Sequence, residues 1–271
     1  MSQMSSPTET NFGKQYCGDC LEIMPAFLDK SVDMVLCDLP YGMVACKWDV
    51  IIPFDLLWKQ YKRIIKDKGV IVLFGSEPFS SYLRLSNIGM YKYDLYWKKE
   101  KPTNIFQLKR RFGKSTETIS IFYVVQPTYN PQMVIYNGKK VTNKPNGIHK
   151  SIVSGDSKQK VTPYSDTGFR YPVDVLEFRR EVLGTTVHPT QKPVALFEYL
   201  IRTYTNEGDT VLDNCAGVLT AAVAAINTNR KYICIEKDEK YFQIGTERIR
   251  KHLSQPRKII GKSNIQDFLR K

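Results

Sequence analysis

The residues in this chain that are best suited to chemistry are the consecutive Asp38, Leu39, Pro40 and Tyr41, which combine a carboxylate, a proline turn and an aromatic ring. They follow an apolar run, Val32 to Cys37, which predicts a buried strand. Ligands bind at the carboxyl ends of strands in open α/β sheets. A carboxylate and a carbonyl there can accept hydrogen bonds from an amino group, and an aromatic ring can stack on the base that carries it. Alone, however, these four residues are more simply explained as an acidic strand end before a proline turn.

A second candidate site lies between Val211 and Gly217. Val211 and Leu212 predict a strand, Asp213 and the next residue an acidic turn, and Gly217 the opening of a helix. Glu236 follows the next strand about 20 residues later, the spacing of an acidic residue that accepts hydrogen bonds from ribose hydroxyls. Because the full Gly-x-Gly-x-x-Gly pattern is missing, a nucleoside cofactor without a pyrophosphate fits better. An ordinary βαβ crossover remains the alternative.

The elements that must position these residues alternate between strand and helix. The predicted strands are 32–37, 70–74, 91–97, 118–125, 210–212 and 232–235. The predicted helices are 54–66, 78–85, 193–204, 217–227 and 239–252, the last capped by Asp238. This alternation predicts an α/β fold with a parallel sheet and helices on both of its faces.

Composition divides the chain into five parts. Residues 1–12 are expected to form a flexible tail and residues 254–271 a basic C-terminal tail. Residues 13–127 and 186–253 form the two halves of the α/β domain. Between them, residues 128–185 are rich in Pro, Gly, Asn, Ser, Lys and Tyr, which predicts an irregular insert with short strands at 133–136 and 173–178.

The chain of 271 residues has a formal net charge of +13, which favours an acidic partner such as nucleic acid. Cys17 and Cys20 have metal-site spacing, but no second pair completes a zinc site, so all six cysteines are expected to be reduced structural thiols. An apolar signal core and a membrane-spanning run are both missing, so a cytoplasmic location is expected.

Taken together, these segments resemble the amino-group DNA methyltransferases. Asp38-Leu39-Pro40-Tyr41 is similar to that family's Asp-Pro-Pro-Tyr, and His188-Pro189-Thr190-Gln191-Lys192-Pro193 resembles the element before its cofactor strand. Cys17-Gly18-Asp19-Cys20-Leu21 resembles its Gly-Asp element, whose Asp lies near the cofactor's adenine. The resemblance covers residues 14 to 250 apart from the insert, and the catalytic motif precedes the cofactor motif, as in the β class.

The resemblance implies a Rossmann-like, S-adenosylmethionine-dependent methyltransferase sheet with an inserted target-recognition region. It implies methyl transfer to the exocyclic amino group of a flipped base, with Asp38 and a backbone carbonyl near Leu39 or Pro40 accepting hydrogen bonds from that amino group and Tyr41 stacking on the base. Asp at position 38 favours adenine N6, since cytosine-N4 enzymes more often carry Ser there. No metal is implied. The implied cofactor-binding residues are Asp19, Cys20, Asp38, Thr190, Lys192, Asp213, Asn214, Ala216, Gly217, Thr220 and Glu236.

The implied partner is double-stranded DNA, while a monomer, a homodimer and a restriction partner all stay open. Basic residues cluster after the strand predicted at 91–97, with Trp97, Phe106 and Phe112 interleaved, and Lys99 belongs to the same run. A solvated charged loop is the alternative explanation. The predicted DNA-binding residues are Lys98, Lys101, Lys109, Arg110, Arg111 and Lys114, together with Lys139, Lys140, Arg179 and Arg180 of the insert.

One departure from the family's cofactor loop leaves a second function open. Where the family has Ser and Gly, this chain has Val218 and Leu219, which can crowd the cofactor. If the replaced glycine needs a positive φ, leucine costs about 1 kcal/mol or more. A catalytically silent DNA-binding protein of the same fold is therefore the alternative. Methylation of RNA or of a protein amide is a third hypothesis, disfavoured for protein amides by Asp38, and the incomplete glycine pattern disfavours a nicotinamide dehydrogenase.

Overall fold

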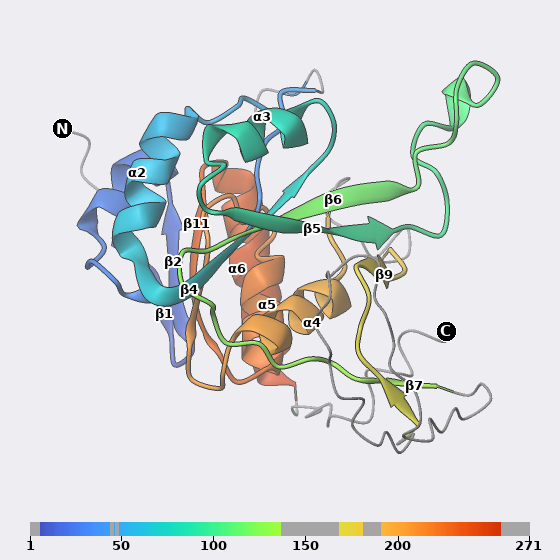
Figure 1. The fold of residues 1–271 in the computed structure, drawn as a ribbon. Helices are drawn as coiled ribbons and strands as arrows, with labels where there is room; N and C mark the ends of the chain where they lie inside the picture. The colour runs from blue at the N-terminus through green and yellow to red at the C-terminus, as the bar shows by residue number, and fades with distance from the viewer. Residues whose placement is uncertain (1–5, 44–45, 47–48, 137–167, 181–190, 256–271) are drawn as a thin grey trace. The chain divides into compact units, whose positions relative to one another are not determined.

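The computed structural model describes residues 6–43, 46, 49–136, 168–180 and 191–255. The chain divides into two compact units, one built from residues 1–130 and 173–271 and the other from residues 131–172. The first unit contains a nine-stranded sheet in the order β1-β2-β11-β10-β3-β4-β6-β5-β9 (Figure 1). Its strands are β1 (Thr8–Thr10), β2 (Gly13–Cys17), β3 (Val32–Asp38), β4 (Ile65–Gly75), β5 (Tyr91–Lys98), β6 (Thr116–Phe122), β9 (Val175–Glu177), β10 (Thr210–Asp213) and β11 (Lys231–Glu236).

The sheet is mixed, so the expectation of a parallel sheet is only partly met. Strands β2, β11, β10, β3 and β4 are parallel to their neighbours in that series. Strand β6 is antiparallel to both β4 and β5, and β1 is antiparallel to β2. The reason is connectivity: backbone hydrogen bonds close the base of the connection between β5 and β6, so the chain turns back as in a hairpin, and strands joined in this way are antiparallel.

Helices cover both faces of this sheet, as expected for the α/β class (Figure 1). On one face lie α1 (Cys20–Ile23), α2 (Phe54–Ile64) and α3 (Phe79–Ser86), and on the other α4 (Val194–Tyr204), α5 (Thr220–Asn227) and α6 (Glu239–Ser254). Strand β3 serves both cores, because Met34 and Leu36 pack with α4 and α5 while Val35 and Cys37 pack with α2. Alternate side chains of a strand point to opposite faces, so an unbroken apolar run is what a doubly covered strand requires.

Several boundaries differ from the predicted ones, and three of these differences bear on the fold. Helix α2 ends at Ile64 and β4 begins at once with Ile65, which pairs with Val32 across a register shift. Helix α5 begins at Thr220 rather than Gly217, since Leu219 has a left-handed conformation that cannot belong to a right-handed helix. Within the expected flexible tail, β1 pairs with β2.

The insert is also less irregular than its composition suggests. Strand β9 lies within 128–185, yet it pairs with β5 and forms the edge of the main sheet. In the smaller unit, β7 (Val134–Ile135) and β8 (Phe169–Arg170) form an antiparallel pair, and the Arg170 guanidinium lies 4.3 Å from the centre of the Tyr136 ring. Lys139 and Lys140 lie outside the described residues.

All six cysteines are free thiols, as expected. Within the described residues, no cluster of His, Cys, Asp or Glu is arranged to hold a metal ion. Across the same part of the chain, no helix combines the length and the apolar character that crossing a membrane requires.

Candidate active site

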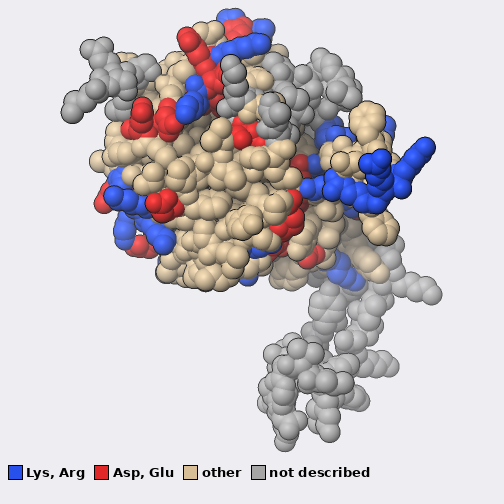
Figure 2. All heavy atoms as spheres, turned by 90° about the horizontal axis from the view of Figure 1, so that it is seen from above, with Lys and Arg blue, Asp and Glu red and all other residues tan. Residues whose placement is uncertain are grey.

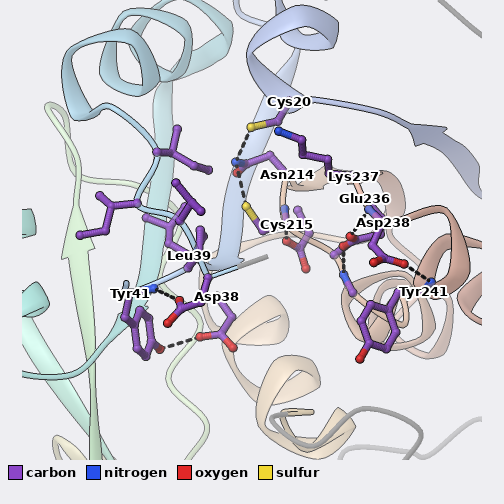
Figure 3. Close-up of a pocket in the computed structure, with 18 of the residues that line it drawn as sticks. Cys20, Asp38, Leu39, Tyr41, Asn214, Cys215, Glu236, Lys237, Asp238 and Tyr241 are labelled. Atoms are coloured by element: carbon purple, nitrogen blue, oxygen red, sulfur yellow. Dashed lines mark hydrogen bonds between the residues drawn. The ribbon is translucent and has the colours of Figure 1, made fainter. Parts of the chain in front are cut away.

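A cavity of about 580 Å³ opens at the carboxyl ends of β3, β10 and β11. These strands are neighbours in the sheet, so residues far apart in the sequence meet there: β10 pairs in parallel with both β3 and β11. Figure 3 shows the Asp38–Tyr41 corner on one side and Glu236, Asp238 and Tyr241 on the other. Every predicted catalytic or cofactor residue that is described lines this pocket, namely Asp19, Cys20, Asp38, Pro40, Tyr41, Lys192, Asp213, Asn214, Ala216, Gly217, Thr220 and Glu236. Thr190 lies outside the described residues.

The loop that follows β3 is held by Asp49, a residue that the sequence analysis missed. Its Oδ1 accepts hydrogen bonds from the backbone N–H groups of Tyr41 (2.7 Å) and Gly42 (2.9 Å), and its Oδ2 accepts one from Met43 (2.6 Å). Leu39 is 4% exposed and packs into the core. The corner is therefore fixed by a carboxylate clamp and an apolar anchor, which replace some of the rigidity that a second proline would supply.

The Asp38 carboxylate has partners on both of its oxygens. The Tyr41 hydroxyl donates to Oδ1 at 2.6 Å, and the Lys192 ammonium donates to Oδ2. Burial and the nearby Asp38 charge raise the pKa of Tyr41 well above its usual value, so its hydroxyl stays protonated and remains a donor. The Tyr41 ring is partly buried and packs against Phe79 with the ring centres 5.0 Å apart.

Buried charges of alternating sign continue from Asp38 into the sheet. Lys192 lies between Asp38 and Glu117, with its Nζ 3.2 Å from Glu117 Oε2, and Lys99 donates to the other Glu117 oxygen. Burial opposes the Lys192 charge, but the two carboxylates outweigh it and hold its pKa above its usual value. Burial likewise opposes the Glu117 charge, but the two ammonium groups lower its pKa. The expectation that Lys99 belongs to a DNA-facing surface is wrong, because Lys99 is only 5% exposed.

On the other side of the pocket, Glu236 organises the turn after β10. Its Oε2 accepts from the backbone N–H of Gly217 at 2.6 Å, and its Oε1 accepts from Asp238 at 2.7 Å. Asp238 caps α6 by accepting from the Tyr241 N–H at 3.1 Å, as predicted. Burial raises the pKa of Glu236. Gly217 has φ +52°, a left-handed conformation that a glycine adopts without strain.

Sequence reasoning missed several lining residues besides Asp49. Glu117 stands in a polar-apolar alternating strand, where nothing distinguishes it from a solvent-facing carboxylate. The apolar edge of the pocket comes from the loop before α2, residues Val50 to Pro53, and Tyr241 comes from the first turn of α6. Only the position of Asp238 and Tyr241 beside the predicted helix start offered a signal.

Leu219 does not crowd the cavity. It has φ +59°, so the condition under which leucine would be strained is met, but its side chain is fully buried and lies against Gly245 of α6. The cavity is lined by its neighbours Val218 and Thr220 instead. Burying a leucine side chain contributes about 1.5–3 kcal/mol, which offsets a left-handed strain of about 1–2 kcal/mol. Leu219 thus contributes to the core and stays out of the pocket, while Val218 is one of the lining residues.

This packing predicts that Gly245→Ala destabilises the protein by about 2 kcal/mol, despite the better helix propensity of alanine. A Cβ at position 245 would lie 2.5 Å from Leu219 Cγ and 3.1 Å from the Val218 backbone. Urea unfolding measures the effect, and Leu219→Ala in the same background should recover part of the loss. Gly89→Ala is the matched control, since a Cβ there meets nothing within 4 Å. Equal stability of the two alanine variants would contradict this account.

The buried Asp213 carboxyl group makes the stability of the folded protein depend on pH. Burial raises its pKa to about 7, although the Cys215 N–H donates to it at 3.1 Å, and Asp38 and Glu236 add repulsion. In the unfolded chain the pKa is near 3.8. Between these values the folded protein binds the extra proton, so this contribution to stability is complete below about pH 3.8 and is lost as the pH rises to about 7.

We therefore expect the melting temperature of Asp213→Asn to increase relative to that of the wild type as the pH rises from 5 to 8. The variant has no carboxylate to ionise in the core, whereas the wild type does. Differential scanning fluorimetry of both proteins across this range checks the prediction. Asp67→Asn, a change at an exposed carboxylate, should run parallel to the wild type. If the Asp213→Asn curve also runs parallel, Asp213 does not titrate in this window.

The predicted DNA-binding residues that the structure describes differ in exposure and in their partners. Lys101, Lys109, Arg110 and Arg111 are exposed on the connection between β5 and β6, where Figure 2 shows basic side chains gathered on a projection. Some members of the set have acidic or polar partners within the protein: Lys98 pairs with Glu177 (2.7 Å), Arg180 lies 3.7 Å from Glu100, Lys114 donates to Ser76, and the exposed Arg111 donates to Gln107. Arg179 is exposed. Trp97, expected among the surface aromatics, is buried and donates to the Phe178 carbonyl at 2.8 Å.

Comparison with known proteins agrees with this arrangement. A family model described as DNA methylase, for the N6 and N4 methyltransferases, matches residues 32–247. The DNA adenine methyltransferase YhdJ of Escherichia coli (strain K12) is 27% identical over 249 residues, which cover 86% of this chain and 81% of that protein.

Solved structures show the same fold. The M1.HpyAVI–SAM complex is 26% identical, covers 87% of this chain and 99% of its own, and superposes with a TM-score of 0.56. The PvuII DNA methyltransferase, which is cytosine-N4-specific, is 18% identical, covers 99% and 95%, and has a TM-score of 0.66, a likeness of fold alone. The fold, the pocket and the family match lead to one conclusion: the chain belongs to the DNA methylase family of amino-group (N6-adenine and N4-cytosine) methyltransferases.

Proposed function

We propose that this protein transfers a methyl group from S-adenosylmethionine to the exocyclic amino group of a base in double-stranded DNA, and that this group is adenine N6. The observation that carries the proposal is the cavity that joins the Asp38 corner to Asp213 and Glu236. Family membership supports the reaction class. The carboxylate at position 38 and the similarity to an adenine methyltransferase support adenine over cytosine.

The lining of the cavity fits this cofactor. Its volume, about 580 Å³, is that of an ordinary small-molecule site. The carboxylates of Asp38, Asp213 and Glu236 complement a sulfonium cation and hydroxyl groups, and Ile51 and Ile52 offer an apolar surface to a purine. When bound, S-adenosylmethionine supplies a methyl group activated by attachment to positively charged sulfur.

The cofactor side of the pocket is organised before any ligand enters. Both Glu236 oxygens already hold backbone N–H groups, which orient the carboxylate while leaving acceptor capacity for ribose hydroxyls. Asp19 accepts from the Leu21 N–H at 2.9 Å at the start of α1 and pairs with Lys237 at 2.9 Å, so it too is held in place. Preorganised polar groups lower the cost of ordering a ligand.

The Asp38 corner prepares the amino group. An exocyclic amine is a poor nucleophile because its lone pair is delocalised into the ring. A carboxylate accepts hydrogen bonds only, so Asp38 and the backbone carbonyl near Leu39 or Pro40 would each accept a hydrogen bond from the amino group, which keeps its protons while its lone pair is freed for attack. Tyr41 and Lys192 hold Asp38 in the required orientation. After transfer, the nitrogen carries one proton too many, and Asp38 is placed to accept it.

The target atom of a paired base is out of reach inside a duplex, so the base must leave the stack. The Tyr41 ring, which lines the cavity beside Asp38, is placed to stack on it. Positioning and electrostatics then supply the catalytic effect, without a covalent enzyme intermediate.

Two measurements test the proposal. Calorimetry with S-adenosylmethionine should show one binding site per chain. Incubation with tritiated cofactor and mixed DNA, followed by digestion and separation of nucleosides, should place the label on N6-methyladenine. Label on N4-methylcytosine would overturn the base assignment, and cofactor binding without any transfer to DNA would overturn the proposed substrate.

A further inference from the structure

The connection between β5 and β6, residues 99–115, forms an ordered projection that we call the basic arm. Its root is closed by backbone hydrogen bonds from Lys99 N to Ser115 O (2.7 Å) and from Thr103 N to Lys114 O (3.0 Å). Farther out, the Asn104 side chain joins the two sides: its Nδ2 donates to the Phe112 carbonyl at 3.0 Å, and its Oδ1 accepts from Lys114 N at 2.6 Å. The arm therefore has a defined shape of its own.

The tip of the arm exposes two complete aromatic side chains. Phe106, in the 3-10 turn η2 (Ile105–Gln107), is 101% exposed, and Phe112 is 98% exposed. Ile105 beside them is 62% exposed. Each phenylalanine forgoes roughly 1.5–3 kcal/mol of burial by standing in water. The side-chain hydrogen bonds of Asn104 fix the shape of the arm. The two rings therefore stand on an ordered surface that a binding partner can cover.

The charge of the arm restricts what that partner is. Lys101, Lys109, Arg110 and Arg111 are exposed on the arm, whereas Glu100 is its single acidic residue. These cations cannot be covered favourably by an apolar or basic protein surface, but they match a row of phosphates. Figure 2 shows the basic side chains gathered on this projection.

The root of the arm adjoins the pocket. Lys99, the first arm residue, pairs with Glu117, which lines the cavity and contacts the Lys192 that holds Asp38. At the other end of the arm, Lys114 donates to Ser76, which directly follows β4. A duplex whose target base enters the cavity therefore runs past the arm.

We propose that Phe106 and Phe112 insert into the DNA duplex beside the target base while the arm's cations bind the flanking phosphates. This inference rests on the proposed function for the identity of the partner. A base that leaves the duplex creates a gap in the stack, and an apolar side chain that enters such a step fills the gap and holds the helix open. The exposed rings supply the wedge, and the hydrogen bonds of Asn104 hold it ready.

The test compares three variants of the full-length protein by fluorescence anisotropy. The probes are a random-sequence 30-base-pair duplex pool and the same pool with one central abasic site. Phe106→Ala/Phe112→Ala should weaken duplex binding roughly tenfold or more without changing the salt dependence of affinity. Lys109→Ala/Arg110→Ala should instead reduce the slope against salt, by roughly one for each phosphate that the variant no longer binds. Tyr82→Ala, an exposed aromatic on α3, is the matched control and should bind like the wild type.

The abasic probe separates insertion from simple surface contact. An abasic step is already unstacked, so the wild type should bind it several-fold more tightly than the paired duplex. The double phenylalanine variant should lose this preference. Because both rings are exposed, its melting temperature should equal that of the wild type, which shows that any weaker binding is not misfolding. Unchanged duplex affinity and a retained abasic preference would overturn the wedge.

The wedge and the proposed function can fail separately. If the wild type methylates DNA and the double phenylalanine variant binds and methylates equally well, the wedge is wrong and the function stands. If the wild type transfers no methyl group, but removing the two rings lowers its duplex affinity and abolishes its preference for the abasic probe, the proposed function is wrong and the wedge stands. Ring-dependent binding to phosphatidylserine vesicles, with no effect on duplex binding, would make the arm a membrane-binding element and overturn the proposal.

Discussion

Asp38→Asn and Asp38→Ala are each expected to reduce methyl transfer at least roughly 10³-fold while leaving duplex affinity nearly unchanged. Asparagine keeps the shape of the side chain but turns an amide N–H₂ toward a group that must donate. Alanine removes the acceptor entirely. The prediction is checked by measuring both the transfer of tritiated methyl groups to DNA and the affinity for duplex DNA. A residue that acts only on the amino group affects methyl transfer and leaves duplex affinity unchanged.

Two comparisons make the Asp38 result specific. Asp67→Ala removes an exposed carboxylate that pairs with Lys30 outside the pocket, and it should transfer methyl groups at the wild-type rate. Tyr41→Phe should have an intermediate effect, since it removes the 2.6 Å hydrogen bond to Asp38 and keeps the ring. Turnover near the wild-type level in Asp38→Ala would remove this carboxylate from the mechanism.

Lys192→Met should have the largest effect on stability, a loss of about 3 kcal/mol in the free energy of unfolding, together with a severe loss of activity. Lys192 is only 6% exposed and separates Asp38 from Glu117. Methionine fills the space, but it leaves two largely buried carboxylates facing each other. Urea unfolding gives the stability, and the methyl-transfer assay gives the activity.

A control and a cycle distinguish the buried network from any lysine–aspartate pair. Lys66→Met breaks an ion pair with Asp33 whose lysine is 45% exposed, and it should cost less than about 1 kcal/mol. Adding Glu117→Gln to Lys192→Met should recover part of the stability, because one of the stranded charges is then removed. Equal costs for the two lysine substitutions would show that the network around Lys192 contributes no more than a surface pair.

The same network fixes the pH range over which this stability is available. The pKa of Glu117 in the folded protein lies below its ordinary value of 4.5, so its contribution is complete above about pH 4.5 and is lost as the pH falls below it. The pKa of Lys192 lies above its ordinary value of 10.5, so its contribution is complete below about pH 10.5 and is lost as the pH rises further. Both contributions to the stability of the wild type should therefore be constant between about pH 4.5 and pH 10.5.

The fold class and most of the site could be predicted from the sequence because their signals are local. An unbroken apolar run identified β3, and helical periodicity identified α2 and α4. Asp38 and Asp213 each stand at the carboxyl end of a strand, where ligands bind in such sheets, and because those two strands are neighbours both residues line one pocket.

What the sequence by itself determined, then, is which residues line the pocket at the strand ends and which strands hold them, since strand ends and motifs depend on neighbours along the chain. Only the tertiary structure decided three features: the antiparallel pairing of β6 with β4, the burial of Lys99 in an ion pair with Glu117, and the packing of Leu219 against Gly245. Each of these three features depends on a partner that is distant in the sequence. The charge or volume of that partner sets the burial and the pKa of a side chain, and the neighbouring residues along the chain do not reveal it.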